Sequence, residues 1–139
     1  MFEFIIFIFV GFTTLLLISG LFYTNYIFGK NKKAWAPKVK RKLTELRKLT
    51  TNQDTHAKKY ALIEADKLLD HVFKKLHFKG ETMGERLKSA KKWYSPELYN
   101  KIWEAHKARN TLVHEVSITL PDQITLKHFE TLERAILKL

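Results

Sequence analysis

The sequence predicts an all-α protein with an N-terminal transmembrane helix followed by a helical bundle. Three observations lead to this: an uncharged stretch near the N-terminus, apolar residues at helical spacing through the rest of the chain, and no long stretch that alternates at period two. Of the 139 residues, 45% are hydrophobic and 28% charged, which is typical of a folded domain. The chain contains no cysteine, which excludes disulfides, thiolate nucleophiles and cysteine-based zinc sites.

The N-terminal stretch carries no charge between Glu3 and Lys30. A helix of about 20 residues crosses a hydrocarbon core of about 30 Å, so this stretch is long enough to span a membrane. A buried core helix is less expected, because soluble helices of this length are seldom apolar on every face. A cleaved signal peptide needs a basic beginning, whereas this chain opens Met-Phe-Glu. We therefore expect residues 1–29 to be an uncleaved anchor.

Basic residues follow this stretch directly. Nine basic residues and one acidic residue give residues 30–48 a net charge of +8, whereas 16 basic and 12 acidic residues leave +4 for residues 49–139. The positive-inside rule then predicts a single-pass protein with its N-terminus outside and its C-terminal domain in the cytoplasm. The same charge would attract anionic lipid headgroups, and attraction to RNA is a further option.

Residues 30–53 are predicted to be a juxtamembrane linker that contains a short basic helix. Val39, Leu43, Leu46 and Leu49 recur at helical spacing after a break at Pro37. Periodicity does not decide whether this helix lies on the membrane or packs on the domain. Its side chains expected to face lipid or nucleic acid are Lys38, Lys40, Arg41 and Lys42.

Residues 54–139 are predicted to form a bundle of four to five helices. The first helix, over residues 55–78, presents one apolar stripe, and Gly80 is expected to end it in a left-handed conformation. The stripe consists of Ala57, Ala61, Ala65, Leu68, Leu69, Val72 and Leu76. Thr82 and Glu85 have the spacing of a capping box, which predicts a second helix over about residues 83–93.

The sequence Ser95-Pro96-Glu97 supplies an N-cap, a proline at the first helical position and an acid that complements the helix dipole. It opens a helix over residues 97–116. Val116 to Leu120 could be locally extended, and Pro121 prevents continuation of that helix. A last helix points Leu126, Phe129, Leu132, Ile136 and Leu139 inward.

No metal or cofactor is expected. The chain has six histidines, but ligands on one helix face need spacings of three or four, as in H-E-x-x-H. His71 and His77 are six positions apart, and His106 and His114 are eight apart. The sequence also shows no glycine-rich phosphate loop and no pattern of a serine or cysteine triad.

The stretch EAHKARNTLVHEVS, residues 104–117, holds the candidate chemistry. Arg109 and His114 are five residues apart, roughly 140° around a helix, so one straight helix cannot bring them to a single small group. Asn110 and His114 are four apart and share a face. From spacing alone, His114 could simply stabilise a helix C-terminus, and Arg109 could be the partner of a surface ion pair.

The arrangement Arg109-Asn110, three residues, then His114 resembles the signature of the HEPN superfamily. In that family an arginine followed by a polar residue precedes a histidine four to six residues later. The all-helical context and the position of the motif late in the domain agree with the resemblance, which covers roughly residues 55–139. It implies a helical bundle that forms a homodimer with the motif helices side by side.

The resemblance also implies a metal-independent endoribonuclease of toxin or defence systems, with RNA as substrate and an antitoxin or regulatory protein as a partner. Arg109, Asn110 and His114 match the signature positions. Family members often place an acidic residue on the upstream helix, and Glu64, at the edge of the apolar stripe, is our candidate, while Asp70 is expected to point further out. The 2′-hydroxyl of RNA is the nucleophile, imidazole groups transfer protons, and Arg109 holds the phosphate.

Two other functions fit the sequence. The first is a non-catalytic, membrane-tethered module of the same fold that dimerises or binds a partner, with the motif as a structural remnant. The second is an adaptor at the lipid surface, in which the basic residues 30–48 carry the function by binding the membrane. Retention of the arginine, asparagine and histidine together favours the enzyme, and we adopt it narrowly over the binding module.

Overall fold

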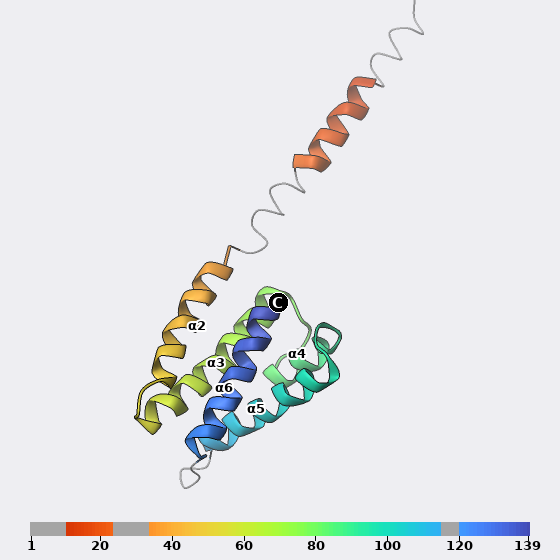
Figure 1. Cartoon of the computed structure of the whole chain (residues 1–139). Coiled ribbons are helices and arrows are strands. Elements are labelled where there is room, and N and C mark those ends of the chain that lie inside the picture. The colour runs from red at the N-terminus through yellow and green to blue at the C-terminus, as the bar shows by residue number, and fades with distance from the viewer. Residues whose placement is uncertain (1–10, 24–33, 115–119) are drawn as a thin grey trace, which may run out of the picture. The chain divides into compact units, whose positions relative to one another are not determined.

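The protein is all-α in every part described by this computed structural model, which covers residues 11–23, 34–114 and 120–139 (Figure 1). Residues 11–23 are helical. The remaining elements are α2 (Ala36–Thr50), α3 (Thr55–Lys75), α4 (Met83–Ser89), a 3₁₀ turn η1 (Lys91–Trp93), α5 (Pro96–His114) and α6 (Asp122–Lys138). The predicted all-α class is therefore confirmed. The suggested extension at Val116 to Leu120 falls mainly on residues outside the described ranges.

Residues 37–139 form one compact unit. Helix α6 packs against α3 and α5, α3 also contacts α4 and α5, and the interior between them is apolar. Periodic apolar positions on each helix supply this core, as expected for amphipathic helices that bury one stripe. Its largest fully buried apolar side chains are Phe73, Phe129, Leu46, Leu62, Leu69, Leu87, Ile102, Leu132 and Val72.

Helix α2 belongs to this unit, which settles the choice that its periodicity left open. Val39, Leu43 and Leu46 are buried in the unit. Arg47 also reaches α6, where its guanidinium lies 3.2 Å from Glu130 and 2.6 Å from Glu133. Pro37 lies in the first turn of the helix and is not a break before it, which agrees with the tolerance of proline there. The helical unit thus begins near residue 37 and includes a segment that we expected to be a linker.

The end of α3 differs from the prediction. The helix stops at Lys75 with Leu76 as its cap, and His77 adopts the left-handed conformation with φ of 57°. Gly80 also has a positive φ, 136°, but it lies in the loop, so our assignment of Gly80 as the residue that ends the helix was wrong. Its glycine identity still matters, because an added Cβ would lie 2.5 Å from the Cβ of Glu85.

The N-caps of the next two helices are those that the sequence predicts. The hydroxyl of Thr82 accepts from the backbone N–H of Glu85 and the Glu85 carboxylate accepts in return, so the capping box at the start of α4 is confirmed. The second helix is shorter than expected, because α4 ends at Ser89 and the turn η1 follows. At α5, the Ser95 hydroxyl accepts from the backbone N–H of Leu98 at 3.3 Å, as an N-cap does.

Helix α5 is buried unevenly along its length. Its buried side chains, Leu98, Ile102 and Ala105, all lie in its first ten residues. The residues from His106 to His114 are half-buried or exposed. The second half of α5 therefore has no fully buried side chain.

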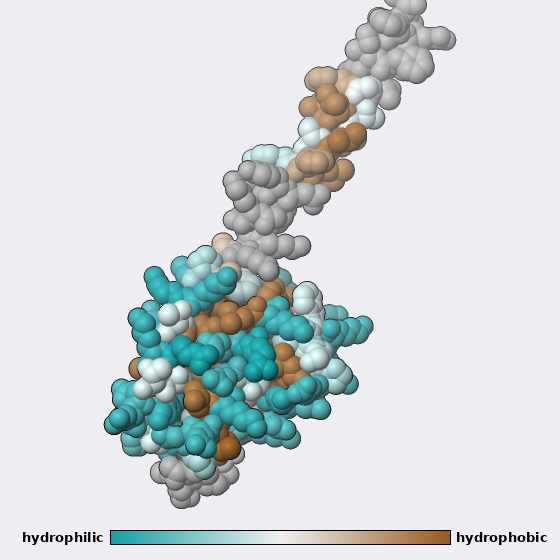
Figure 2. Space-filling model, in the orientation of Figure 1, coloured by the Kyte–Doolittle hydropathy of each residue, from teal (hydrophilic) through white to brown (hydrophobic). Residues whose placement is uncertain are grey.

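The helical residues 11–23 carry exposed apolar side chains, among them Phe12, Leu15, Leu17 and Phe22 (Figure 2). The rest of the predicted anchor, residues 1–10 and 24–29, lies outside the described residues. Within residues 11–23, 34–114 and 120–139, no helix is both long enough and apolar enough to cross a membrane.

Candidate functional site

A carboxylate lies on the buried face of α3. Asp66 is four residues after Leu62 and three before Leu69, both of which are buried, and its own side chain is only 4% exposed. Burial of a charged carboxylate is costly unless the group is paired and hydrogen-bonded. Asp66 therefore requires partners from a neighbouring helix, and α5 provides them.

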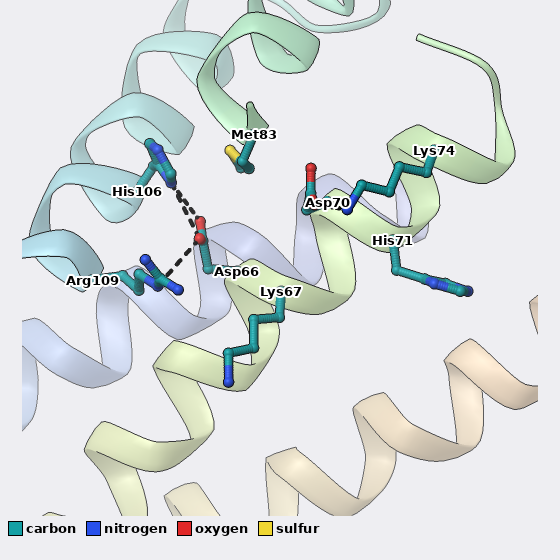
Figure 3. A pocket seen from close by; sticks show the side chains of 8 residues that line it. All are labelled: Asp66, Lys67, Asp70, His71, Lys74, Met83, His106 and Arg109. Carbon is teal, nitrogen blue, oxygen red and sulfur yellow. Dashed lines mark hydrogen bonds and ion pairs between the residues drawn. The ribbon is translucent and has the colours of Figure 1, made fainter. Parts of the chain in front are cut away.

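His106 and Arg109 of α5 converge on Asp66 (Figure 3). Nδ1 of His106 lies 3.0 and 3.1 Å from the two carboxylate oxygens. Nε of Arg109 lies 3.6 Å from Oδ2, which makes an ion pair but not a hydrogen bond, and this buried nitrogen has no hydrogen-bond partner. Because the two α5 residues are three positions apart, roughly 60° around the helix, both can reach the same group.

Asn110 closes this cluster into a ring of contacts. The guanidinium of Arg109 donates from Nη1 to Oδ1 of Asn110 at 2.9 Å, and Nδ2 of Asn110 lies 3.4 Å from Nε2 of His106. We call Asp66, His106, Arg109 and Asn110 the α3–α5 polar cluster. Apart from Nε of Arg109, the contacts pair the members with one another, so the cluster joins α3 to α5 where α5 has no further buried apolar side chain.

A pocket of about 350 Å³ opens beside the cluster. Three side chains of the cluster, Asp66, His106 and Arg109, line it, and Met83 of α4 lies between His106 and Asp70 (Figure 3). The remaining lining residues, all on α3, are Lys67, Asp70, His71 and Lys74. The wall is thus rich in nitrogen donors, and its two carboxylates are both engaged by cations.

Asp70 is the second carboxylate. Nε of Arg86 lies 2.6 Å from its Oδ1, and Nζ of Lys74 lies 2.8 Å from its Oδ2. Burial raises the pKa of Asp70, but hydrogen bonds from Arg86 and Lys74 outweigh it, so that the pKa lies below its usual range. The expectation that Asp70 points further out was wrong: its side chain is 17% exposed and ties α3 to α4.

The structure separates the residues predicted for the site. Arg109 and Asn110 belong to the α3–α5 polar cluster. His114, the last residue of α5, is exposed and does not line the pocket. Glu64 accepts from its neighbour Lys67 at 2.8 Å, and the carboxylate that meets Arg109 is that of Asp66. The basic residues Lys38, Lys40 and Arg41 are exposed on α2, and Lys42 is half-buried.

Sequence reasoning missed Asp66 and His106. Asp66 could have been found, because an acidic residue in the middle of an apolar stripe needs a buried partner. His106 was considered only as a metal ligand and set aside on spacing. Within the described ranges no group of three or more histidine, aspartate or glutamate side chains is placed to hold a metal ion.

Comparisons of the chain with protein-family models, with curated proteins and with solved structures give no match. The resemblance to the HEPN superfamily therefore rests on residues 109–114 and on the order of the helices.

Proposed function

We propose that the chain is a membrane-anchored endoribonuclease of the HEPN type that needs no metal and uses Arg109 to bind the scissile phosphate. The observation that carries the proposal is the place of Arg109: it lines a pocket with His106, Lys67 and Lys74. The carboxylates Asp66 and Asp70 line it too, and the three cations are paired with Asp66, Glu64 and Asp70. A phosphate bound here would exchange these carboxylate contacts for charge-assisted hydrogen bonds from the guanidinium and ammonium groups, which are strong in phosphate binding.

The proposed reaction needs no nucleophile from the protein. The 2′-hydroxyl of the RNA attacks the adjacent phosphorus, the bond to the 5′-oxygen breaks, and the products are a 2′,3′-cyclic phosphate and a 5′-hydroxyl. Arg109 stabilises the charge that develops on the phosphate oxygens. One imidazole accepts the proton of the 2′-hydroxyl and another protonates the 5′-oxygen.

His114 is the proton-transfer group suggested by the motif, and a homodimer would supply two copies of it. A two-fold interface repeats the same contacts on both copies, so the exposed end of α5 would meet its own equivalent. Anchoring by residues 1–29 is supported by the lack of charge between Glu3 and Lys30 and by the exposed apolar side chains of residues 11–23.

A non-catalytic binding module is the second candidate. The observation in its favour is that Arg109 is already paired with Asp66 and Asn110, while His114 does not line the pocket. In that case the cluster would serve only to hold α3 and α5 together. The two candidates differ in whether the chain cleaves RNA.

The test uses the full-length chain, expressed in cells that are then separated into membrane and supernatant fractions. We expect the membrane fraction to cleave an end-labelled RNA in the presence of EDTA and to leave 2′,3′-cyclic phosphate ends. His114→Ala and Arg109→Lys should each slow cleavage by about 100-fold or more, and His56→Ala, at an exposed histidine near the start of α3, should not. Cleavage that persists unchanged in His114→Ala and Arg109→Lys would contradict the assignment.

A further inference from the structure

The α3–α5 polar cluster holds a second imidazole that the motif does not include. His106 shares a helix face with Arg109 and lines the same pocket. Its side chain is 12% exposed, and its ring meets the Trp103 ring edge-on with centroids 5.9 Å apart. The ring is therefore fixed in place and still reachable from the pocket.

The contacts of His106 determine which nitrogen carries its proton. The Asp66 carboxylate only accepts hydrogen bonds when ionised, so Nδ1 at 3.0 Å from it is the nitrogen that donates. The Asn110 amide nitrogen only donates, so Nε2 at 3.4 Å from it is the nitrogen that accepts. In the neutral ring the lone pair is thus on Nε2, which makes only a long contact to Asn110 and lies beside Gly84 of α4, where an added Cβ would be 4.0 Å away.

We propose that His106, oriented by Asp66, is the general base of the proposed RNA cleavage, and that RNA binds in the pocket between α3 and α5. This inference rests on the proposed function. Nε2 of His106 takes the proton of the 2′-hydroxyl, while the Asn110 amide moves aside. The oxygen–phosphorus bond forms, the bond to the 5′-oxygen breaks, and His114 of a second copy gives that oxygen its proton.

The geometry favours His106 over His114 as the base. Arg109 and His106 are separated by one turn, so a phosphate bound to the guanidinium would place its neighbouring ribose within reach of the imidazole. Arg109 and His114 lie about 140° apart around the helix. When His106 accepts the proton it becomes a positively charged imidazolium. The negative carboxylate of Asp66 stabilises this charge, as a carboxylate does in other carboxylate–histidine pairs.

The His106→Asn variant tests whether His106 acts as a base or only supports the fold. The Asn amide nitrogen can replace Nδ1 as the donor to Asp66, but the variant has no basic nitrogen in place of Nε2. We expect the full-length variant to keep its melting temperature and its oligomeric state, and to cleave RNA about 100-fold or more slowly than wild type. The matched control, His56→Asn, should cleave as wild type does.

His106→Ala provides a second readout. Loss of the ring leaves a space beside Asp66, and added imidazole should restore part of the cleavage. Pyrazole, a ring of the same size but a much weaker base, should not, and neither compound should accelerate the wild type. A residue that only supports the fold would show no difference between the two compounds.

Each outcome decides one question. If wild type cleaves RNA and His106→Asn cleaves equally well, the inference is overturned and the proposed function stands. The inference is also overturned if His106→Asn is inactive but imidazole and pyrazole act alike on His106→Ala. If wild type itself does not cleave RNA, the proposed function fails, and the inference falls with it.

Discussion

Replacement of Arg86 by methionine should destabilise the helical unit, because it removes the guanidinium that pairs with the carboxylate of Asp70. The Arg86 side chain is 7% exposed and donates to Asp70 at 2.6 Å and to the carbonyl oxygen of Gly80 at 2.7 Å. Methionine fills a similar volume but leaves Asp70 with Lys74 alone, whose side chain is 58% exposed. Removal of one partner from a buried pair costs about 3–5 kcal/mol. Because Lys74 remains, we expect a loss of about 2–3 kcal/mol, near the value of a hydrogen bond to a charged group.

The loss should depend on pH with a definite sign. Arg86 and Lys74 hold the pKa of Asp70 below its unfolded value, so their stabilisation is present at neutral pH and disappears as pH falls through the folded pKa. In the Arg86→Met variant the cost comes from an ionised Asp70, which becomes neutral in acid. The difference in unfolding free energy between wild type and variant should therefore narrow below about pH 4.

Urea unfolding followed by circular dichroism at several pH values measures both the loss of unfolding free energy and its dependence on pH. A loss of this size corresponds to a fall in Tm of roughly 8–24 °C for a unit of this length. Lys88→Met, an exposed cation on the same helix, is the control and should change stability by less than about 0.5 kcal/mol. Equal losses in Arg86→Met and Lys88→Met, or a difference from wild type that stays constant into acid, would refute the reasoning.

Two further predictions concern the rest of the unit. Leu46→Ala removes a fully buried side chain of α2 and should lower the free energy of unfolding in urea by about 2–4 kcal/mol. Thr44→Ala, at an exposed position of the same helix, should change this free energy little. An unchanged free energy in Leu46→Ala would show that α2 does not share the core in solution. Burial lowers the pKa of His128, with Glu104 opposing and Lys127 adding to this effect. Since the unfolded state then binds the proton more readily, stability should fall as pH drops from 7 to 5, and His128→Gln should make that fall shallower.

Much of the fold could be predicted because its elements depend on local signals. The capping box of Thr82 and Glu85, the N-cap Ser95 and the break at Pro121 are each set by neighbouring residues, and all three mark helix starts in the structure. The end of α3 could not be read in the same way. His77 takes the left-handed conformation although its Cβ disfavours it, three residues before the glycine expected there.

The candidate site was harder to predict, because contacts between helices are not encoded by spacing on one helix. Arg109 and Asn110 were found from the motif, but their nearest titratable partners were not. Asp66 belongs to the buried stripe of α3, and the sequence alone does not state which α5 residue faces it. The position of α2 was undecided for the same reason, since an amphipathic helix can bury its stripe in a domain or in a lipid surface.

The uneven burial of α5 has a mechanical consequence. After Ala105 this helix contributes no fully buried side chain, and the ring of contacts around Asp66 links the turn that carries Arg109 to α3. Local opening of such a segment requires less free energy than unfolding of the whole unit. The turns that carry Asn110 and His114 are therefore expected to open at a lower free energy than the core, and their amides to exchange hydrogen sooner than those near Ile102.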